Sequence, residues 1–146
     1  MRHRFDKYFL VIEDEEEIAD LLKSLIEEAI PSSHVVIADS SLEAKRKLAL
    51  QKFNTIIVDL NLNKSMGDEL PKYIRSKNEF NKETPLIICS GMISQTRISI
   101  LSKYTKHFFV KPFDMDKLIN IIKKLVKKDE KNNLQKHLQK RFSKSA

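Results

Sequence analysis

The chain lacks the features of a membrane or secreted protein. It has no apolar run close to the roughly 18 residues that span a bilayer. The apolar stretch Tyr8–Ile12 is too short for the core of a signal peptide, and no small-residue cleavage site follows it. The one cysteine, Cys89, has no partner for an internal disulfide and lies inside an apolar run. We therefore expect a cytoplasmic protein with a buried, unreactive thiol.

The histidines and the charged residues show two further features of the chain. The four histidines are scattered, without the spacing of a metal site or the helix of a histidine phosphotransfer protein. The net charge of +7 comes entirely from the C-terminal stretch. Residues 1–122 carry 18 basic and 18 acidic side chains, whereas residues 123–146 carry 9 basic and 2 acidic side chains. The 146 residues therefore suit one neutral domain followed by a basic appendage.

Short apolar runs alternate with helical patterns along this domain. Five runs predict strands, and several are continuous in apolar residues, as in parallel strands covered on both faces: Tyr8–Ile12, Val35–Ala38, Thr55–Val58, Leu86–Cys89 and Phe108–Val110. Apolar residues three or four apart predict five helices around Ile18–Ala29, Leu42–Leu50, Gly67–Ser76, residues 94–104 and Leu118–Val126. Ser40 and Asp114 are expected to cap the second and fifth helices. This order predicts an α/β fold with a doubly wound parallel sheet.

Charged and polar residues follow four of the five predicted strands. Glu13 and Asp14 follow the first strand, Asp59 the third, Ser90 the fourth and Lys111 the fifth. The carboxyl ends of parallel strands form one rim of the sheet, where ligands of such folds bind. Three close carboxylates need a divalent cation, and an all-oxygen ligand set favours Mg²⁺. A lysine across the rim is suited to phosphoryl oxygens, so the pattern indicates phosphoryl transfer.

Four stretches now point to one family. FLVIEDE, TIIVDLNL with Gly67 downstream, LIICSG and FFVKPF occur in the order and at the spacing found in receiver domains of two-component response regulators. The chain resembles such a receiver, of the chemotaxis-regulator kind, over residues 7–128. The resemblance implies a flavodoxin-like sheet of five strands in the order 2-1-3-4-5, with five helices. It also implies a signalling protein rather than an enzyme, apart from its own phosphorylation and slow dephosphorylation.

The resemblance further implies a role for each residue at the rim. Asp59 corresponds to the phosphoacceptor, which attacks a phosphohistidine donor. Glu13, Asp14 and Asp59, with the backbone carbonyl of Asn61, correspond to the Mg²⁺ ligands. Glu13 stands where aspartate is more usual, so its longer side chain is expected to shift the ion or bind it through water.

The remaining implied roles concern the response to phosphorylation. Lys111 corresponds to the lysine that pairs with the phosphoacceptor and then with the phosphoryl oxygens, and its bond to Pro112 is expected to be cis. Ser90 corresponds to the hydroxyl that hydrogen-bonds the phosphoryl group, and Phe108 to the aromatic switch residue. Simpler interpretations stay open: Ser90 can shape a turn before Gly91, and Phe108 can be an ordinary core residue.

The basic appendage, residues 129–146, has three interpretations. We expect a solvated and largely disordered extension. Leu134, Leu138 and Phe142 lie four apart, so an amphipathic helix that extends the fifth helix or docks on a partner is the second interpretation. Contact with nucleic acid or an anionic membrane is the third. The segment is too short for a winged-helix or helix-turn-helix domain, so we expect no DNA-binding domain.

These observations predict a single-domain response regulator. Its expected partners are a sensor histidine kinase or phosphotransfer protein and a downstream protein target, and it is expected to be a monomer or weak dimer. The sequence leaves three alternatives open: a phosphorelay shuttle, a Mg²⁺-dependent α/β phosphohydrolase, and a module whose acidic rim only holds Mg²⁺. Against the phosphohydrolase, Asn61 stands two residues beyond Asp59, where such enzymes often place a second acid.

Overall fold

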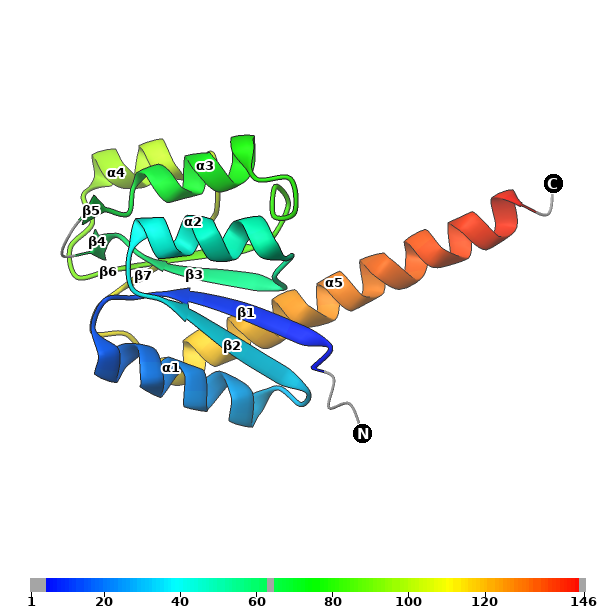
Figure 1. Ribbon diagram of the computed structural model, residues 1–146, viewed down its shortest axis with the longest axis horizontal. Helices are drawn as coiled ribbons and strands as arrows, with labels where there is room; N and C mark the ends of the chain where they lie inside the picture. Colours follow the sequence, from blue (N-terminus) through cyan, green and yellow to red (C-terminus); the bar gives the residue numbers. More distant parts are fainter. Residues whose placement is uncertain (1–4, 63–64, 145–146) are drawn as a thin grey trace.

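A five-stranded parallel sheet forms the centre of the molecule (Figure 1). The computed structural model describes residues 5–62 and 65–144, with residues 65 and 66 described in their backbone only. The strands follow the spatial order β2-β1-β3-β6-β7, which confirms the predicted flavodoxin-like order. Their bounds differ from the predicted ones by two residues at most: β1 Lys7–Ile12, β2 Ser33–Ala38, β3 Thr55–Asp59, β6 Leu86–Ser90 and β7 His107–Val110.

Five helices cover the two faces of this sheet: α1 Glu16–Ala29, α2 Ser41–Leu50, α3 Glu69–Lys77, α4 Gln95–Leu101 and α5 Met115–Ser143. In Figure 1, α1 and α5 lie on one face, and α2, α3 and α4 lie on the other. Both expected caps are present. The Ser40 hydroxyl accepts a hydrogen bond from the Glu43 amide at 3.2 Å, and Asp114 accepts from the Asp116 amide at 2.9 Å.

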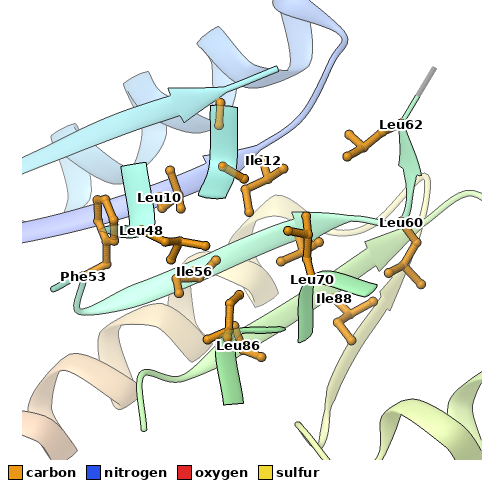
Figure 2. Packing of buried hydrophobic residues seen from close by; sticks show 14 of the residues in the cluster. Leu10, Ile12, Leu48, Phe53, Ile56, Leu60, Leu62, Leu70, Leu86 and Ile88 are labelled. Atoms are coloured by element: carbon orange, nitrogen blue, oxygen red, sulfur yellow. The ribbon is translucent and has the colours of Figure 1, made fainter. Parts of the chain in front are cut away.

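Each face of the sheet has its own hydrophobic core. Side chains alternate along a strand, so Leu10 and Ile12 of β1 point to one side, while Phe9 and Val11 point to the other. The first core packs β1, β3 and β6 against α2, α3 and α4 (Figure 2). The second packs the opposite sides of the same strands against α1 and α5. This double coverage explains why the strand sequences are continuously apolar.

A small hairpin after β3 was not predicted. It pairs β4, Asn61–Leu62, with β5, Ser65–Met66, in antiparallel fashion. Gly67 follows this hairpin, and its amide donates to the Leu60 carbonyl at 2.9 Å. A Cβ atom at Gly67 would lie 2.7 Å from the Asp59 carbonyl oxygen. Glycine therefore allows the hairpin to fold back against the end of β3, next to the polar rim.

The C-terminal appendage differs from the expected disordered extension. Residues 129–143 are helical and continue α5, which is a single helix of 29 residues. This end of α5 projects beyond the sheet (Figure 1). The expectation was wrong because α5 is already nucleated and packed through Leu118, Ile122 and Val126, so the following residues need only propagate an existing helix. Among the described residues, no helix is long and apolar enough to cross a bilayer.

Candidate functional site

The polar rim lies where four parallel strands end. Asp59 and Ser90 are the last residues of β3 and β6, and Glu13 and Lys111 directly follow β1 and β7. Parallel pairing of β1 with β3, β3 with β6, and β6 with β7 brings these ends to one edge. The Lys111 amide also donates to the Ser90 carbonyl at 2.7 Å, which fixes the start of the loop after β7.

The ammonium group of Lys111 bridges two buried carboxylates. Its Nζ atom lies 2.6 Å from Glu13 Oε1 and 3.1 Å from Asp59 Oδ2. The second oxygen of Asp59, Oδ1, accepts the backbone amide of Asn61 at 2.9 Å. Glu13 is 2% exposed and Asp59 is 4% exposed, so both charges are largely removed from water. One lysine thus contacts both carboxyl groups.

The carboxylates differ in their affinity for protons. Burial, together with the nearby charge of Asp59, raises the pKa of Glu13 to about 8, although Lys111 acts in the opposite direction. The pKa of Asp59 is lowered: burial opposes this shift, but hydrogen bonds with Glu13, the Asn61 amide and Lys111 outweigh it. The pKa of Lys111 is raised because both carboxylates stabilise its charge against the effect of burial. Asp59 is therefore the ionised carboxylate of the pair at neutral pH.

Three carboxylates at the rim form a possible cation site. Glu13, Asp14 and Asp59 each offer an oxygen, and these oxygens lie within 4.8 Å of one another. Among the described residues, Glu13 Oε2 is a buried oxygen without a hydrogen-bond partner. A hard divalent ion such as Mg²⁺ fits this donor set, because it would satisfy the buried oxygen and offset the negative charge.

The Ser90 hydroxyl forms hydrogen bonds that do not involve the carboxylates or Lys111. It donates to the Met92 carbonyl at 2.8 Å and accepts from the side-chain amide of Asn61 at 3.2 Å. Ser90 is fully buried, although its neighbours Gly91 and Met92 are exposed. The loop after β6 therefore holds the hydroxyl through its own backbone.

Arg97 and Asp68 complete this arrangement, and the sequence analysis did not identify them. Arg97, on α4, forms a two-point ion pair with Asp68, which precedes α3; one of its contacts, from Nε to Oδ2, measures 3.0 Å. Its Nη1 atom also lies 3.4 Å from the Met92 carbonyl oxygen. Nothing in the spacing of these residues distinguishes them from other surface charges, so no sequence signal was available.

Phe108 and Pro112 take up the remaining sequence-predicted positions. Phe108, on β7, is partly buried and packs against the core beneath α4. In the sheet it pairs with Ile88 of β6. The Lys111–Pro112 peptide bond is cis, as the resemblance implied.

Comparison with known proteins assigns the family. Residues 9–123 match the family model of the response regulator receiver domain. The chain belongs to the response regulator receiver family. This receiver is 26% identical over 119 residues to the chemotaxis protein CheY of Listeria monocytogenes, covering 81% of this chain and 97% of that protein. It is 29% identical over 129 residues to the transcriptional regulatory protein KdpE of Staphylococcus aureus, covering 86% of this chain and 53% of that protein.

Solved structures agree with this assignment. The receiver domain of the Francisella response regulator 1452 superposes with a TM-score of 0.73 at 27% identity, covering 85% of this chain and 99% of that one. A receiver domain from Colwellia psychrerythraea reaches a TM-score of 0.76 at 26% identity, covering 84% and 99%. The present receiver spans about half the length of several curated relatives, namely 53%, 48% and 56% of three of them.

Proposed function

We propose that this receiver accepts a phosphoryl group on Asp59 in a Mg²⁺-dependent reaction. The observation that carries the proposal is the position of Lys111 between Glu13 and Asp59 at the rim. The expected donor is a phosphohistidine of a sensor histidine kinase or phosphotransfer protein. The expected consequence is a changed surface that binds a downstream protein, with the receiver acting as a signalling module rather than a turnover enzyme.

Asp59 is suited to the role of nucleophile by its charge and its contacts. Its lowered pKa keeps it ionised at neutral pH. In the transfer, a carboxylate oxygen attacks phosphorus, a P–O bond forms, the P–N bond to the donor imidazole breaks, and the imidazole leaves with a proton. The product is an acyl phosphate, which water can hydrolyse to regenerate the carboxylate.

Lys111 and the acidic residues are suited to the charge that this reaction develops. The Lys111 ammonium already contacts Asp59, so it is placed to pair with phosphoryl oxygens attached there. Glu13, Asp14 and Asp59, with the backbone carbonyl of Asn61, would hold Mg²⁺. When bound, Mg²⁺ supplies positive charge to the phosphoryl oxygens.

The switch is proposed to begin at Ser90. In the unphosphorylated receiver its hydroxyl is hydrogen-bonded to Met92 and Asn61. A phosphoryl group on Asp59 offers a more strongly charged acceptor, so Ser90 is expected to exchange the Met92 carbonyl for it. The loop after β6 would then move, and Phe108, packed beneath α4, would follow this movement.

Mass spectrometry after incubation with acetyl phosphate and Mg²⁺ tests the proposal. Wild-type protein should gain about 80 Da, the mass of one phosphoryl group. Asp59→Asn should gain nothing, whereas Asp20→Asn, which changes an exposed carboxylate of α1, should behave as the wild type. An adduct that survives in Asp59→Asn would contradict the proposal. Repeated turnover of a small phosphomonoester would instead support the phosphohydrolase alternative.

A further inference from the structure

The proposed function leaves the projecting part of α5 without a role. Residues 130–144, called here the projecting segment, are all exposed. The segment begins where α5 leaves the domain, at the edge of the sheet opposite the phosphorylation rim (Figure 1). At that edge Lys7 pairs with Glu130 at 3.4 Å, and the Asn54 side chain donates to Asp129 at 3.4 Å.

Positive charge dominates the projecting segment. The two acidic residues of the 24-residue C-terminal stretch, Asp129 and Glu130, are the ones that contact the domain. Beyond them the segment carries only basic charged side chains: Lys131, Lys136, Lys140, Arg141 and Lys144. Residues 1–122 are neutral overall, and the segment, with five basic side chains and one acidic side chain, carries +4 of the chain's net charge of +7. Its partner is therefore expected to be anionic.

An apolar row and three of the five basic side chains occupy opposite sides of the segment. Leu134, Leu138 and Phe142 repeat every four residues and are 59%, 41% and 73% exposed. Each is followed two positions later by a lysine. Two positions correspond to about 200° around a helix, so the lysines lie opposite the apolar row. The projecting segment is thus an amphipathic helix with an apolar row and three lysines across from it, whereas Lys131 and Arg141 lie on the side of the apolar row.

We propose that the projecting segment binds an anionic lipid surface. The apolar row would enter the boundary between headgroups and acyl chains, and the basic side chains would remain among the anionic headgroups. Nucleic acid would neutralise the lysines but leave Leu134, Leu138 and Phe142 in water. A second copy of the helix would bring two strongly basic segments together. Successive residues of the apolar row are also offset by about 40° around the helix axis, so the row winds around the helix. A fluid interface accommodates a winding row more readily than a straight protein groove does.

This placement leaves the phosphorylation rim accessible. α5 starts near the carboxyl ends of the strands and ends beyond their amino ends, so Asp59 and the projecting segment lie at opposite ends of the molecule (Figure 1). A receiver held to a membrane through the segment would keep Glu13, Asp59 and Lys111 open to a phosphodonor. The inference rests on the helix alone and does not depend on phosphorylation of Asp59.

Tryptophan fluorescence offers a direct test, because the chain contains no tryptophan. In Phe142→Trp the single indole reports on the apolar row. Vesicles of phosphatidylglycerol and phosphatidylcholine should shift its emission to shorter wavelength, and vesicles of phosphatidylcholine alone should not. A tryptophan at another exposed site, Phe80→Trp, should show no shift with either vesicle. Absence of a shift in Phe142→Trp with the anionic vesicles would overturn the proposal.

Co-sedimentation with the same vesicles separates amphipathic binding from simple charge attraction. Leu134→Ser with Leu138→Ser should weaken binding by about tenfold or more, since two apolar side chains no longer enter the interface. The matched control, Leu42→Ser with Leu50→Ser, changes two leucines of α2 that are 60% and 75% exposed and should bind as the wild type. Unchanged vesicle binding by the Leu134/Leu138 variant would contradict the lipid proposal. So would binding of the wild type to duplex DNA that is as tight as its binding to vesicles and that the Leu134/Leu138 variant retains.

Discussion

Lys111 lies closer to Glu13 than to Asp59. Its Nζ atom is 2.6 Å from Glu13 Oε1 and 3.1 Å from Asp59 Oδ2. The longer glutamate side chain, at a position where the family more usually has aspartate, thus competes with the proposed phosphoacceptor for the same ammonium group. A cation that draws Glu13 away would leave Lys111 to Asp59 and to the phosphoryl oxygens.

Magnesium binding is predicted to release a proton at neutral pH. The pKa of Glu13 is raised to about 8 without metal, so at pH 7 this carboxyl is mostly protonated, whereas a metal ligand must be ionised. Titration calorimetry in buffers of different ionisation enthalpy should give a release of about one proton at pH 7, falling toward zero above about pH 9. Glu13→Gln should release none. Equal proton release by the two proteins would contradict the prediction.

Glu13 is also predicted to make the metal-free protein less stable as the pH rises. Its pKa is higher in the folded than in the unfolded chain, so the fold is favoured while Glu13 is protonated, and this contribution is lost between about pH 4.5 and 8. Glu13→Gln removes the effect. Urea denaturation in the presence of a chelator should show the variant more stable than the wild type by about 1–3 kcal/mol at pH 8, with a smaller difference at pH 5.

Arg97 is predicted to hold the loop after β6 in its unphosphorylated position. It links Asp68 to the Met92 carbonyl, which also accepts the Ser90 hydroxyl. Arg97→Gln should free this loop and tighten binding of beryllofluoride, an analogue of the phosphoryl group, by about threefold. The control is Glu69→Gln, which removes the nearby 3.3 Å ion pair with Lys45. A beryllofluoride affinity that is unchanged or weaker in Arg97→Gln alone would contradict the role assigned to Arg97.

Cys89 is predicted to be unreactive in the folded protein. The thiol is buried in the core beneath α1 and α5, and burial raises its pKa to about 12. The thiolate is the reactive form, so iodoacetamide at pH 8 should leave the native protein unmodified and alkylate it fully in denaturant. Rapid alkylation of the native protein would show that the core opens around β6.

The sheet and its rim could be predicted because the signals were local and repeated. Runs such as Leu86–Cys89 are apolar throughout, and strands of this kind are typical of a parallel sheet covered on both sides. Once the sheet was parallel, the residues that follow the strands had to share one edge. The positions of Asp59, Ser90 and Lys111 on that edge therefore followed from the strand ends.

The hairpin after β3 and the Asp68–Arg97 ion pair could not be predicted in the same way, because they produce no periodic pattern in the sequence. The two-residue strands β4 and β5 are too short to produce a pattern. The partners Asp68 and Arg97 are 29 residues apart and resemble ordinary surface charges. The helical state of residues 129–143 was only the second interpretation, after a disordered extension, because isolated short helices are marginal in water, whereas this one continues a helix that the domain already stabilises.

Borohydride trapping tests the central claim most directly. Borohydride reduces an acyl phosphate of aspartate to homoserine, and peptide mapping then gives its position. After treatment with acetyl phosphate and Mg²⁺, we predict homoserine at position 59, and none in Asp59→Asn or in samples without Mg²⁺. Homoserine at Asp14 or at another aspartate, with Asp59 unmodified, would contradict the account of the rim as a phosphoacceptor site.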